Sequence, residues 1–435
     1  MKRVLLISHN ALSMHQNNGK TLASIFSDWP MDNIAQLYFN KEVPESLKFR
    51  NFMRITDEDV IKRILSFGLI KHAGQVLTPT NEQGIASHTD AGTLGFIKEL
   101  AKQHEWMKLI ARDLIFSTDY WYSSNIREWI ASFKPDSIFL LGGNSRFAFK
   151  IATRLSSDLK IPLDIYITDD YIINSAPDNF IEKAIHKKLT RTYIEAISHS
   201  RHLFAIGQEM ASEFKRFFGR EFHVLMNITN SQLPSTQHTR PSAKDGAIDF
   251  VYVGGIHLGR DKTLAALGKL LGEISSHLST PISLNVYSVK PPSPSVLKTF
   301  RSSNVTYCGA IHHHAVEDRI QRADFVVHVE SFDDQFTSKT KLSVSTKIPE
   351  YLSSGACLLA FGPNSLASIK LIEDNKLGIV IGQLNISSDD RSNLINAILS
   401  ESTRNLLSRN ASQYFNANFD SIKIRDTVKK LINQN

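Results

Sequence analysis

Short apolar runs alternate with longer amphipathic stretches through most of the first half of the chain. The apolar runs have the length of strands, and stretches with helical spacing separate them. The runs lie at residues 4–7, 137–141, 163–167, 203–206 and 224–226. Apolar strands separated by helices of about ten or more residues are typical of parallel sheets that helices cover on both faces. The first half is therefore predicted to be a doubly wound α/β domain.

The alternation stops at residues 229–247 and then resumes. The intervening TNSQLPSTQHTRPSAKDGA has two prolines and no apolar periodicity, which favours an interdomain linker. Apolar runs return at residues 250–253, 282–286, 305–308, 325–329, 357–361 and 378–381. We predict two doubly wound Rossmann-like domains, residues 1–228 and 248–415, with a helix at 416–435 that packs back on the first. Ligands are expected in the cleft between these domains.

Residues 94–116 form a long helical pattern in which basic and apolar positions alternate. The basic residues are Lys98, Lys102, Lys108 and Arg112, and the apolar ones include Phe96, Trp106, Leu109 and Phe116. Packing against the domain core explains such a pattern in most helices. A peripheral contact with a membrane surface is the alternative, because an interfacial helix has this composition.

Charge and cysteine content narrow the class of protein. The 435 residues include 50 Lys and Arg against 43 Asp and Glu, a net charge of +7 that suits anionic partners. Nucleic acid is not expected, because no basic run is interleaved with aromatic residues. Two cysteines cannot form a disulfide framework, and the first apolar run ends after four residues, which is too short for a secretory signal. These features predict a cytoplasmic protein.

Three apparent motifs are rejected on their spacing. Residues 19–21 end like a phosphate-binding loop, but Met14 stands where that motif needs glycine. The three histidines at 312–314 lack the spacing of metal ligands, and no metal is expected. The acidic residues 57–59 follow Thr56 at the start of a helical run, where carboxylates cap a helix.

Two segments of the second half have the residues that bind a nucleotide. Gly254 and Gly255 end a strand, and Arg260 and Lys262 lead into a helix that we expect at residues 264–271. Such a turn lets backbone amides and cationic side chains approach a diphosphate. The later segment STKIPEYLSSGACLLAFG, residues 345–362, predicts a loop, a short helix, a glycine stop and a strand.

Charged residues in that later segment add to this prediction. Glu350 lies in the first turn of the short helix, where it either complements the helix dipole or accepts hydrogen bonds from a ribose diol. Lys347 lies three residues earlier and would be near a bound phosphate.

Over nearly its whole length the chain resembles the GT-B fold glycosyltransferases. The resemblance is to the retaining family-4-type enzymes, or glycosyltransferase group 1, of bacterial polysaccharide biosynthesis. It rests on FAIGQEMASEF, VLMNIT, FVYVGGIHLGRDKTL, NVTYCG, RADFVVHVES and STKIPEYLSSGACLLAFG, in this order. The resemblance implies that the first domain binds the acceptor and that the second binds a nucleotide-sugar donor.

Site residues follow from the resemblance position by position. Glu350 would bind the ribose, Arg260 and Lys262 would act on the donor diphosphate, and Gly19 would let its loop approach the transferred sugar. The remaining donor-binding candidates are Gly254, Gly255, Lys347, Asp333 and Asp334.

The chain departs from the family at three places, and one of them is Gly255, which stands where a basic residue commonly follows the first glycine. Many of these enzymes have a second glutamate eight positions before the ribose glutamate, where this chain has Leu342. Either Asp333, Asp334 or Glu330 substitutes for it, or the contact is absent. A histidine often ends the strand after which this chain has Asp169 and Asp170, our catalytic candidates in the first domain.

The leading hypothesis is a glycosyltransferase that moves a sugar from a nucleotide donor to a saccharide or lipid-linked acceptor. It needs no cofactor, since the nucleotide sugar is a substrate, and resemblance implies that it needs no metal. Two alternatives share the fold: a sugar-nucleotide epimerase, and a catalytically silent binding partner.

Overall fold

The computed structural model divides the chain into two compact units. The first comprises Met1–Leu225 and Lys423–Asn435, and the second comprises Met226–Ile422. The structure describes residues 1–13, 17–45, 48–78, 105–175, 177, 179–228 and 246–434, apart from the side chains of Asn17, Glu105, His313 and His314. Most of the expected linker at 229–247 and the first part of the expected helix at 94–116 lie outside these residues. No described helix has both the length and the apolar character needed to cross a membrane.

The first unit is built on an eight-stranded sheet in the order β4-β3-β2-β1-β5-β6-β7-β8. Neighbouring strands are parallel, except that β3 and β4 are antiparallel. The strands are β1 (Val4–Ser8), β2 (Ile34–Tyr38), β3 (Asn51–Arg54), β4 (Gln75–Leu77), β5 (Ser137–Gly142), β6 (Leu163–Ile167), β7 (Leu203–Ala205) and β8 (His223–Val224).

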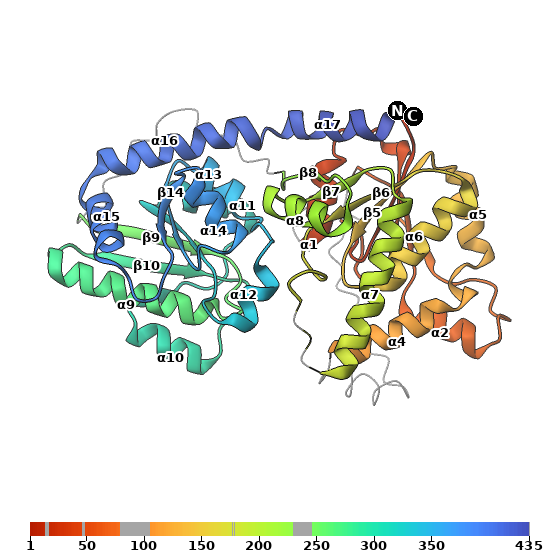
Figure 1. Ribbon diagram of the computed structural model, residues 1–435, viewed down its shortest axis with the longest axis horizontal. Helices are drawn as coiled ribbons and strands as arrows, with labels where there is room; N and C mark the ends of the chain where they lie inside the picture. Colours follow the sequence, from red (N-terminus) through yellow and green to blue (C-terminus); the bar gives the residue numbers. More distant parts are fainter. Residues whose placement is uncertain are drawn as a thin grey trace. The chain divides into compact units, whose positions relative to one another are not determined.

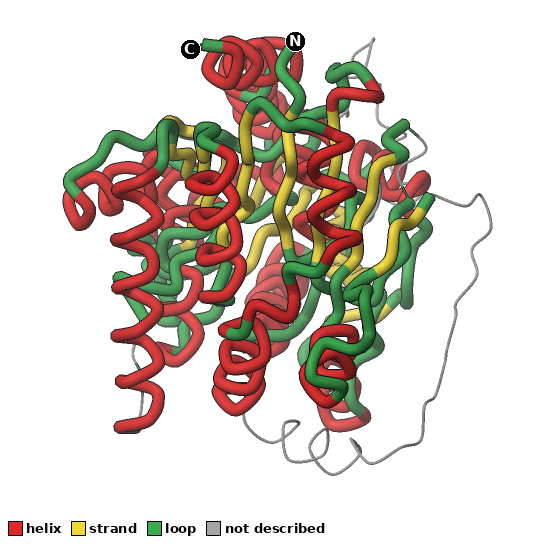
Figure 2. Tube along the Cα trace, turned by 90° about the vertical axis from the view of Figure 1, so that its right-hand side faces the viewer, coloured by secondary structure: helices red, strands yellow, loops and turns green. Residues whose placement is uncertain are grey.

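Helices cover this sheet; Figure 2 shows them in red beside its strands in yellow. They are α1 (Asn17–Ile25), α2 (Asp57–Leu65), α4 (Glu105–Ser117), α5 (Ser124–Phe133), α6 (Arg146–Leu159), α7 (Phe180–His199), α8 (Gln208–Phe218) and α17 (Ser421–Asn433), with short 3-10 turns η1 (Met31–Asn33) and η2 (Asp119–Trp121).

The second unit has a six-stranded sheet in the order β11-β10-β9-β12-β13-β14, and all its strand pairs are parallel. The strands are β9 (Ile248–Val253), β10 (Ile282–Tyr287), β11 (Val305–Tyr307), β12 (Phe325–Val329), β13 (Cys357–Phe361) and β14 (Gly378–Ile381). The helices are α9 (Arg260–Leu278), α10 (Pro294–Ser302), α11 (His313–Gln321), α12 (Asp334–Thr340), α13 (Ile348–Ser353), α14 (Ala367–Asp374), α15 (Ser388–Leu399) and α16 (Glu401–Asn418) (Figure 1).

Alternate residues of the central strands in the second unit enter two separate cores. Phe250 and Tyr252 of β9 pack with α9, α10 and α15 on one face of the sheet. Val251 and Val253 pack with α11, α13, α14 and α16 on the other. Because both faces are covered, the central strands are mostly apolar runs, which is the pattern that the sequence displays. The predicted fold, two doubly wound parallel sheets, is confirmed.

Residues 30–78 contain elements that the sequence pattern did not predict. Strands β2, β3 and β4 extend the first sheet beyond β1, although polar loops separate them. The capping prediction at Thr56 is confirmed: its side chain accepts a hydrogen bond from the Asp59 amide, and the Asp59 carboxylate accepts one from the Thr56 amide. This reciprocal pair starts α2.

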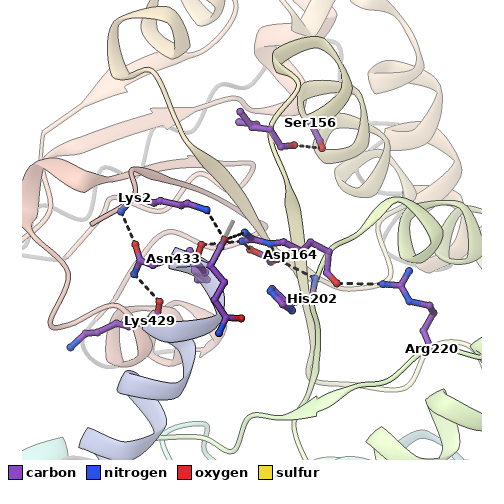
Figure 3. A network of polar contacts seen from close by, with 11 residues as sticks. Lys2, Ser156, Asp164, His202, Arg220, Lys429 and Asn433 are labelled. Carbon is purple, nitrogen blue, oxygen red and sulfur yellow. Dashed lines mark hydrogen bonds and ion pairs between the residues drawn. The ribbon is translucent and has the colours of Figure 1, made fainter.

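Helix α17 is bound to the first unit through a polar network around Asp164 of β6 (Figure 3). The Arg201 guanidinium donates to both carboxylate oxygens of Asp164, at 3.1 and 2.7 Å, and to the Ile432 carbonyl at 3.2 Å. The Lys2 amide donates to the Asn433 side chain at 2.9 Å. The Asp164 side chain is fully buried, so its charge depends on Arg201 for compensation.

We expect Asp164→Asn to lower the free energy of unfolding by about 3 kcal/mol, because it leaves the Arg201 charge without its buried partner. Amide exchange should also become faster across α17, since Arg201 then no longer holds the C-terminal carbonyls in place. Urea unfolding and hydrogen exchange measure the two effects.

Asp158→Asn is the matched control, since the Asp158 side chain is 46% exposed and its ion pair with Arg154 lies on the surface. It should change stability by less than about 0.5 kcal/mol. Equal effects of the two substitutions would contradict the role given to Asp164.

Candidate functional site

The strand order of the second sheet reverses between β9 and β12. Chain order runs outward from β9 through β10 to β11 on one side, and from β12 through β13 to β14 on the other. Ligands of doubly wound sheets bind beyond the carboxyl ends of the strands at such a reversal. The carboxyl ends here are Val253, followed by Gly254, and Val329, followed by Glu330.

The two strands at the reversal pair over only part of their length. Phe325 and Val326 of β12 pair with Phe250 and Val251 of β9. At Val253 the hydroxyl of Tyr351 takes the place of a neighbouring strand, accepting from the Val253 amide at 3.2 Å and donating to its carbonyl at 3.1 Å. Helix α13, which contains both Tyr351 and Glu350, is thereby fixed at the carboxyl end of β9.

Arg260 occupies the first position of α9, four residues before the helix that the sequence predicts. Leu258 and Gly259 precede it in left-handed backbone, with φ of 60° and 73°. Glycine is needed at the second position, since a Cβ there would lie 2.5 Å from the Ser331 hydroxyl. This tight turn brings the first turn of α9 against the end of β12.

A buried ion pair joins α9 to the end of β12. The Arg260 guanidinium lies 3.1 Å from each carboxylate oxygen of Glu330. The two side chains are 17% and 5% exposed. Burial raises the pKa of the Glu330 carboxyl, while Arg260 acts in the opposite direction. Arg260 therefore remains cationic at the carboxyl end of the sheet, with its charge balanced in the absence of a ligand.

Backbone contacts fix Glu330 in place. Its amide donates to the Phe361 carbonyl at 3.0 Å, and its carbonyl accepts from the Thr263 hydroxyl at 3.0 Å. A Cβ on Gly362 would lie 2.9 Å from the Glu330 Cβ, so only glycine fits at that position. Because Glu330 is held in this way, its ion pair also fixes the position of the Arg260 guanidinium.

Lys262 and Asp333 form a looser pair on the surface beside this site. Their charged atoms are 3.6 Å apart, and the Lys262 side chain is 74% exposed. Asp333 also caps α12 by accepting from the Gln335 amide, and Asp334 lies in the first turn of that helix. Lys262 thus adds an accessible cation two residues beyond Arg260, while the donor-binding roles of Asp333 and Asp334 stay predictions.

Glu350 lies in the first turn of α13, as the sequence predicts, and it is buried there. Its carboxylate lies 3.4 Å from the Lys347 ammonium, and the two side chains are 10% and 34% exposed. Leu342, at the position of the second glutamate in the resembling family, is buried. Of the carboxylates offered in its place, Glu330 is paired with Arg260 and Asp333 with Lys262, and a substitution by any of them stays a prediction.

Gly254 and Gly255 leave room for side chains of their own loop. A Cβ on Gly254 would lie 2.9 Å from the Tyr252 hydroxyl, and one on Gly255 would lie 2.5 Å from the His257 ring. The Tyr252 hydroxyl donates to the Gly255 carbonyl at 2.6 Å. These contacts explain the glycines without a ligand, and binding of a diphosphate to their amides stays a prediction.

The candidates in the first unit have structural contacts of their own. A Cβ on Gly19 would lie 2.1 Å from the Ala11 carbonyl oxygen, so glycine lets the loop after β1 lie directly on α1. The Asp170 carboxylate accepts from the amides of Ile172, Ile173 and Asn174 at 2.8 to 2.9 Å. These bonds make Asp170 the residue that folds its loop.

Asp169 differs from Asp170 in being only half-buried, and its carboxylate accepts from the Thr168 hydroxyl at 3.2 Å. Asp169 is thus the more accessible of the two carboxylates. Catalytic roles for both stay predictions.

His328 is a residue of this site that the sequence pattern did not reveal. It lies within β12, and its Nε2 is 3.5 Å from a Glu330 carboxylate oxygen. Burial, together with the Arg260 charge, lowers the pKa of His328 to about 3, so the ring is neutral beside the ion pair. The one available signal was a histidine in an otherwise apolar strand. Among the residues that the structure describes, no group of His, Cys, Asp and Glu is arranged to hold a metal ion.

No family model matches the sequence, and no curated protein matches it. Solved structures do match. WaaG, a glycosyltransferase involved in lipopolysaccharide biosynthesis, is 15% identical with a TM-score of 0.53, over 99% of this chain and 100% of WaaG. A TarM variant from S. aureus, in complex with Fondaparinux, alpha-GlcNAc-glycerol and UDP, is 10% identical with a TM-score of 0.60, over 100% of both chains.

A trehalose-6-phosphate synthase, described in terms of enzymatic glycosyltransfer with retention, is 9% identical with a TM-score of 0.58. It matches over 100% of this chain and 99% of its own. The chain has the GT-B fold. At these identities the comparison shows the fold alone. The reaction at the site is inferred from the residues of this chain.

The lowered pKa of His328 predicts a pH dependence of stability. Between about pH 7 and pH 5 only the unfolded chain takes up a proton at this position, because the pKa of His328 rises from about 3 to 6.5 on unfolding. Stability is therefore lost as the pH falls, by about 2 kcal/mol at pH 5. Between pH 7 and pH 5, the free energy of unfolding in urea should fall by about 2 kcal/mol more for the wild-type chain than for His328→Leu.

His277→Leu, which replaces an exposed histidine of α9, provides the control and should retain the wild-type pH dependence. A pH dependence that is the same in wild type and His328→Leu would show that His328 titrates normally.

Proposed function

We propose that this chain is a glycosyltransferase that moves a sugar from a nucleotide-sugar donor to a saccharide or lipid-linked acceptor in cell-surface polysaccharide synthesis. The observation that supports it most is the set of charges at the strand-order reversal of the second sheet. Arg260 and Lys262 lie in the first turn of α9, and Tyr351 fixes the helix with Glu350 at the end of the same strand. One end of one sheet thus offers cations for a diphosphate and a carboxylate for a ribose.

Arg260 and Lys262 would act on the leaving group. In the transfer, the bond between the anomeric carbon and the diphosphate oxygen breaks. The acceptor hydroxyl oxygen bonds to that carbon and loses its proton, and the nucleoside diphosphate leaves with the bonding electrons. Negative charge therefore grows on the diphosphate in the transition state, where a preorganised cation is most effective. Glu330 preorganises Arg260 before the donor arrives.

Glu350 would bind the donor ribose. A carboxylate accepts hydrogen bonds from both hydroxyl groups of a diol, and hydrogen bonds to charged groups are among the stronger ones. The carboxylate is about one-tenth exposed, which limits competition from water. Lys347 lies beside it and keeps the negative charge balanced.

The finer features of the reaction follow the resemblance. We propose transfer with retention of configuration and without a bound metal or cofactor. WaaG is involved in lipopolysaccharide biosynthesis, and the TarM structure contains UDP with saccharides, which supports a nucleotide donor and a carbohydrate acceptor here. The proposed location is the cytoplasm, where the two free cysteines, Cys308 and Cys357, would remain reduced.

A panel of nucleotide sugars, each incubated with and without saccharide acceptors, tests the proposal. Acceptor-dependent release of a nucleoside diphosphate is the expected result. Conversion of the donor into an isomeric nucleotide sugar would show the epimerase alternative. Nucleotide binding with no turnover for any donor and acceptor would show a silent binding partner.

Glu350→Gln should weaken nucleotide binding about 10- to 100-fold, because the ribose then loses hydrogen bonds to a charged acceptor. Isothermal calorimetry with the nucleoside diphosphate measures the change. Glu317→Gln, on the exposed side of α11, should leave the affinity unchanged. An unchanged affinity in Glu350→Gln would remove this residue from the site.

Lys262→Ala should lower kcat about 100-fold and change the nucleotide affinity much less, if the ammonium stabilises charge that develops on the leaving group. Steady-state kinetics with the active donor separates the two parameters. Lys298→Ala on α10 is an exposed-lysine control and should retain the wild-type rate. Equal losses in affinity and in rate would make Lys262 a ground-state contact.

A further inference from the structure

The turn between α2 and β4 exposes large apolar side chains on the surface of the first unit. Leu65 is 74% exposed, Phe67 86% and Leu69 84%, and Ile70 and Val76 are about half exposed. We call residues 65–70 the apolar turn. Exposed apolar residues scattered singly are common, but a group of them on one short segment indicates an interaction surface.

Hydrogen bonds hold the apolar turn in a defined shape. The amides of Phe67, Gly68 and Leu69 donate to the carbonyls of Ile64, Arg63 and Ser66 at 2.9 to 3.0 Å.

Arg63 connects this turn to the body of the unit. Its guanidinium donates to the Ile70 carbonyl at 3.1 Å and to the Tyr120 carbonyl at 2.8 Å, and it lies over the Tyr120 ring. The exposed apolar side chains therefore project from a turn whose backbone is fixed by hydrogen bonds.

The backbone conformation at Phe67 is unfavourable for an aromatic residue. Its φ is 48°, in the left-handed region that glycine and asparagine tolerate much better than an aromatic residue. The ring packs into no core in return, since it is 86% exposed, more than any other large apolar side chain among the described residues. The left-handed conformation costs free energy, and packing of the ring inside the protein does not offset it. Phe67 is therefore expected to contact a partner outside the folded chain.

Exposed basic side chains flank the apolar turn, and the acidic residues near it are already engaged. Lys62, Lys71 and His72 are exposed within ten residues of Phe67. The three acids in that range have other partners: Asp57 pairs with Arg112, Glu58 pairs with Lys41, and Asp59 caps α2. In the described part of the chain neither Lys62 nor Lys71 takes part in an ion pair. Exposed apolar side chains between free cations complement a surface with anionic groups above an apolar layer.

We propose that the apolar turn inserts into an anionic lipid surface, with Phe67 and Leu69 entering the apolar layer and Lys62 and Lys71 contacting the headgroups. The proposal concerns the first unit alone and does not require the second unit to transfer a sugar. It also assigns the contact to a different segment from the helix that the sequence suggested. In the described half of that helix, Arg112 pairs with Asp57 at 2.9 Å, and Phe116 is buried against Phe147.

Vesicle flotation of the full chain tests the proposal, with phosphatidylcholine vesicles that contain or lack phosphatidylglycerol. Phe67→Asn combined with Leu69→Ser removes the apolar groups, and asparagine suits the left-handed backbone, so the fold is retained. Binding to the anionic vesicles should fall about tenfold or more. Lys62→Glu combined with Lys71→Glu should weaken it by a similar factor and remove its salt dependence.

Val289→Ser is the matched control, since Val289 is 84% exposed but lies in the second unit. It should bind vesicles like the wild type. Three results would overturn the proposal: no flotation of the wild type with anionic vesicles, equal binding to neutral ones, or binding that the apolar substitutions leave intact. A lower melting temperature of Phe67→Asn without vesicle binding would show that the ring is covered by this chain itself.

In the same way, a dimer in sedimentation that Phe67→Asn dissociates, with no binding to vesicles, would identify a second copy of the chain as the partner and contradict insertion into lipid.

Discussion

The buried ion pair between Arg260 and Glu330 is the interaction on which the candidate site depends. Bringing two charges out of water costs several kcal/mol each, and only good geometry recovers it. The structure supplies that geometry through a left-handed turn at Gly259 and backbone bonds on both sides of Glu330. Replacing a buried ion pair with apolar residues of similar volume is often neutral or stabilising in proteins. We therefore infer that the charges are retained for what Arg260 does at the end of the sheet.

The two sheets reverse their strand order in the same way but present different chemistry at their carboxyl ends. In the first unit the side chain that follows β1 is His9, whose ring lies 3.3 Å from the Arg112 guanidinium. The cation itself is paired with Asp57. In the second unit Lys262 is accessible beside Arg260. The accessible cation of the second unit agrees with the proposed binding of an anionic donor there.

The sequence predicted those parts of the fold that depend on local pattern. Apolar runs gave most of the strands, and Thr56 with its following acids gave the start of α2, because both signals lie within a few neighbouring residues. Strands β2 to β4 were missed, since short strands among polar loops have no period of their own. Glu330 was named as a substitute carboxylate, but its pairing with Arg260, 70 residues away, is a product of the fold.

The most direct test of nucleotide binding by Arg260, Lys262 and Glu350 is a crystal structure of the chain with a bound nucleoside diphosphate. The account predicts that the ribose hydroxyl groups bond to the Glu350 carboxylate and that the diphosphate lies beside Arg260 and Lys262, beyond the carboxyl ends of β9 and β12. It also predicts that Glu330 keeps its contact with Arg260 in the complex. A nucleotide bound elsewhere, or one bound at this edge without contact to Arg260 or Glu350, would contradict the account.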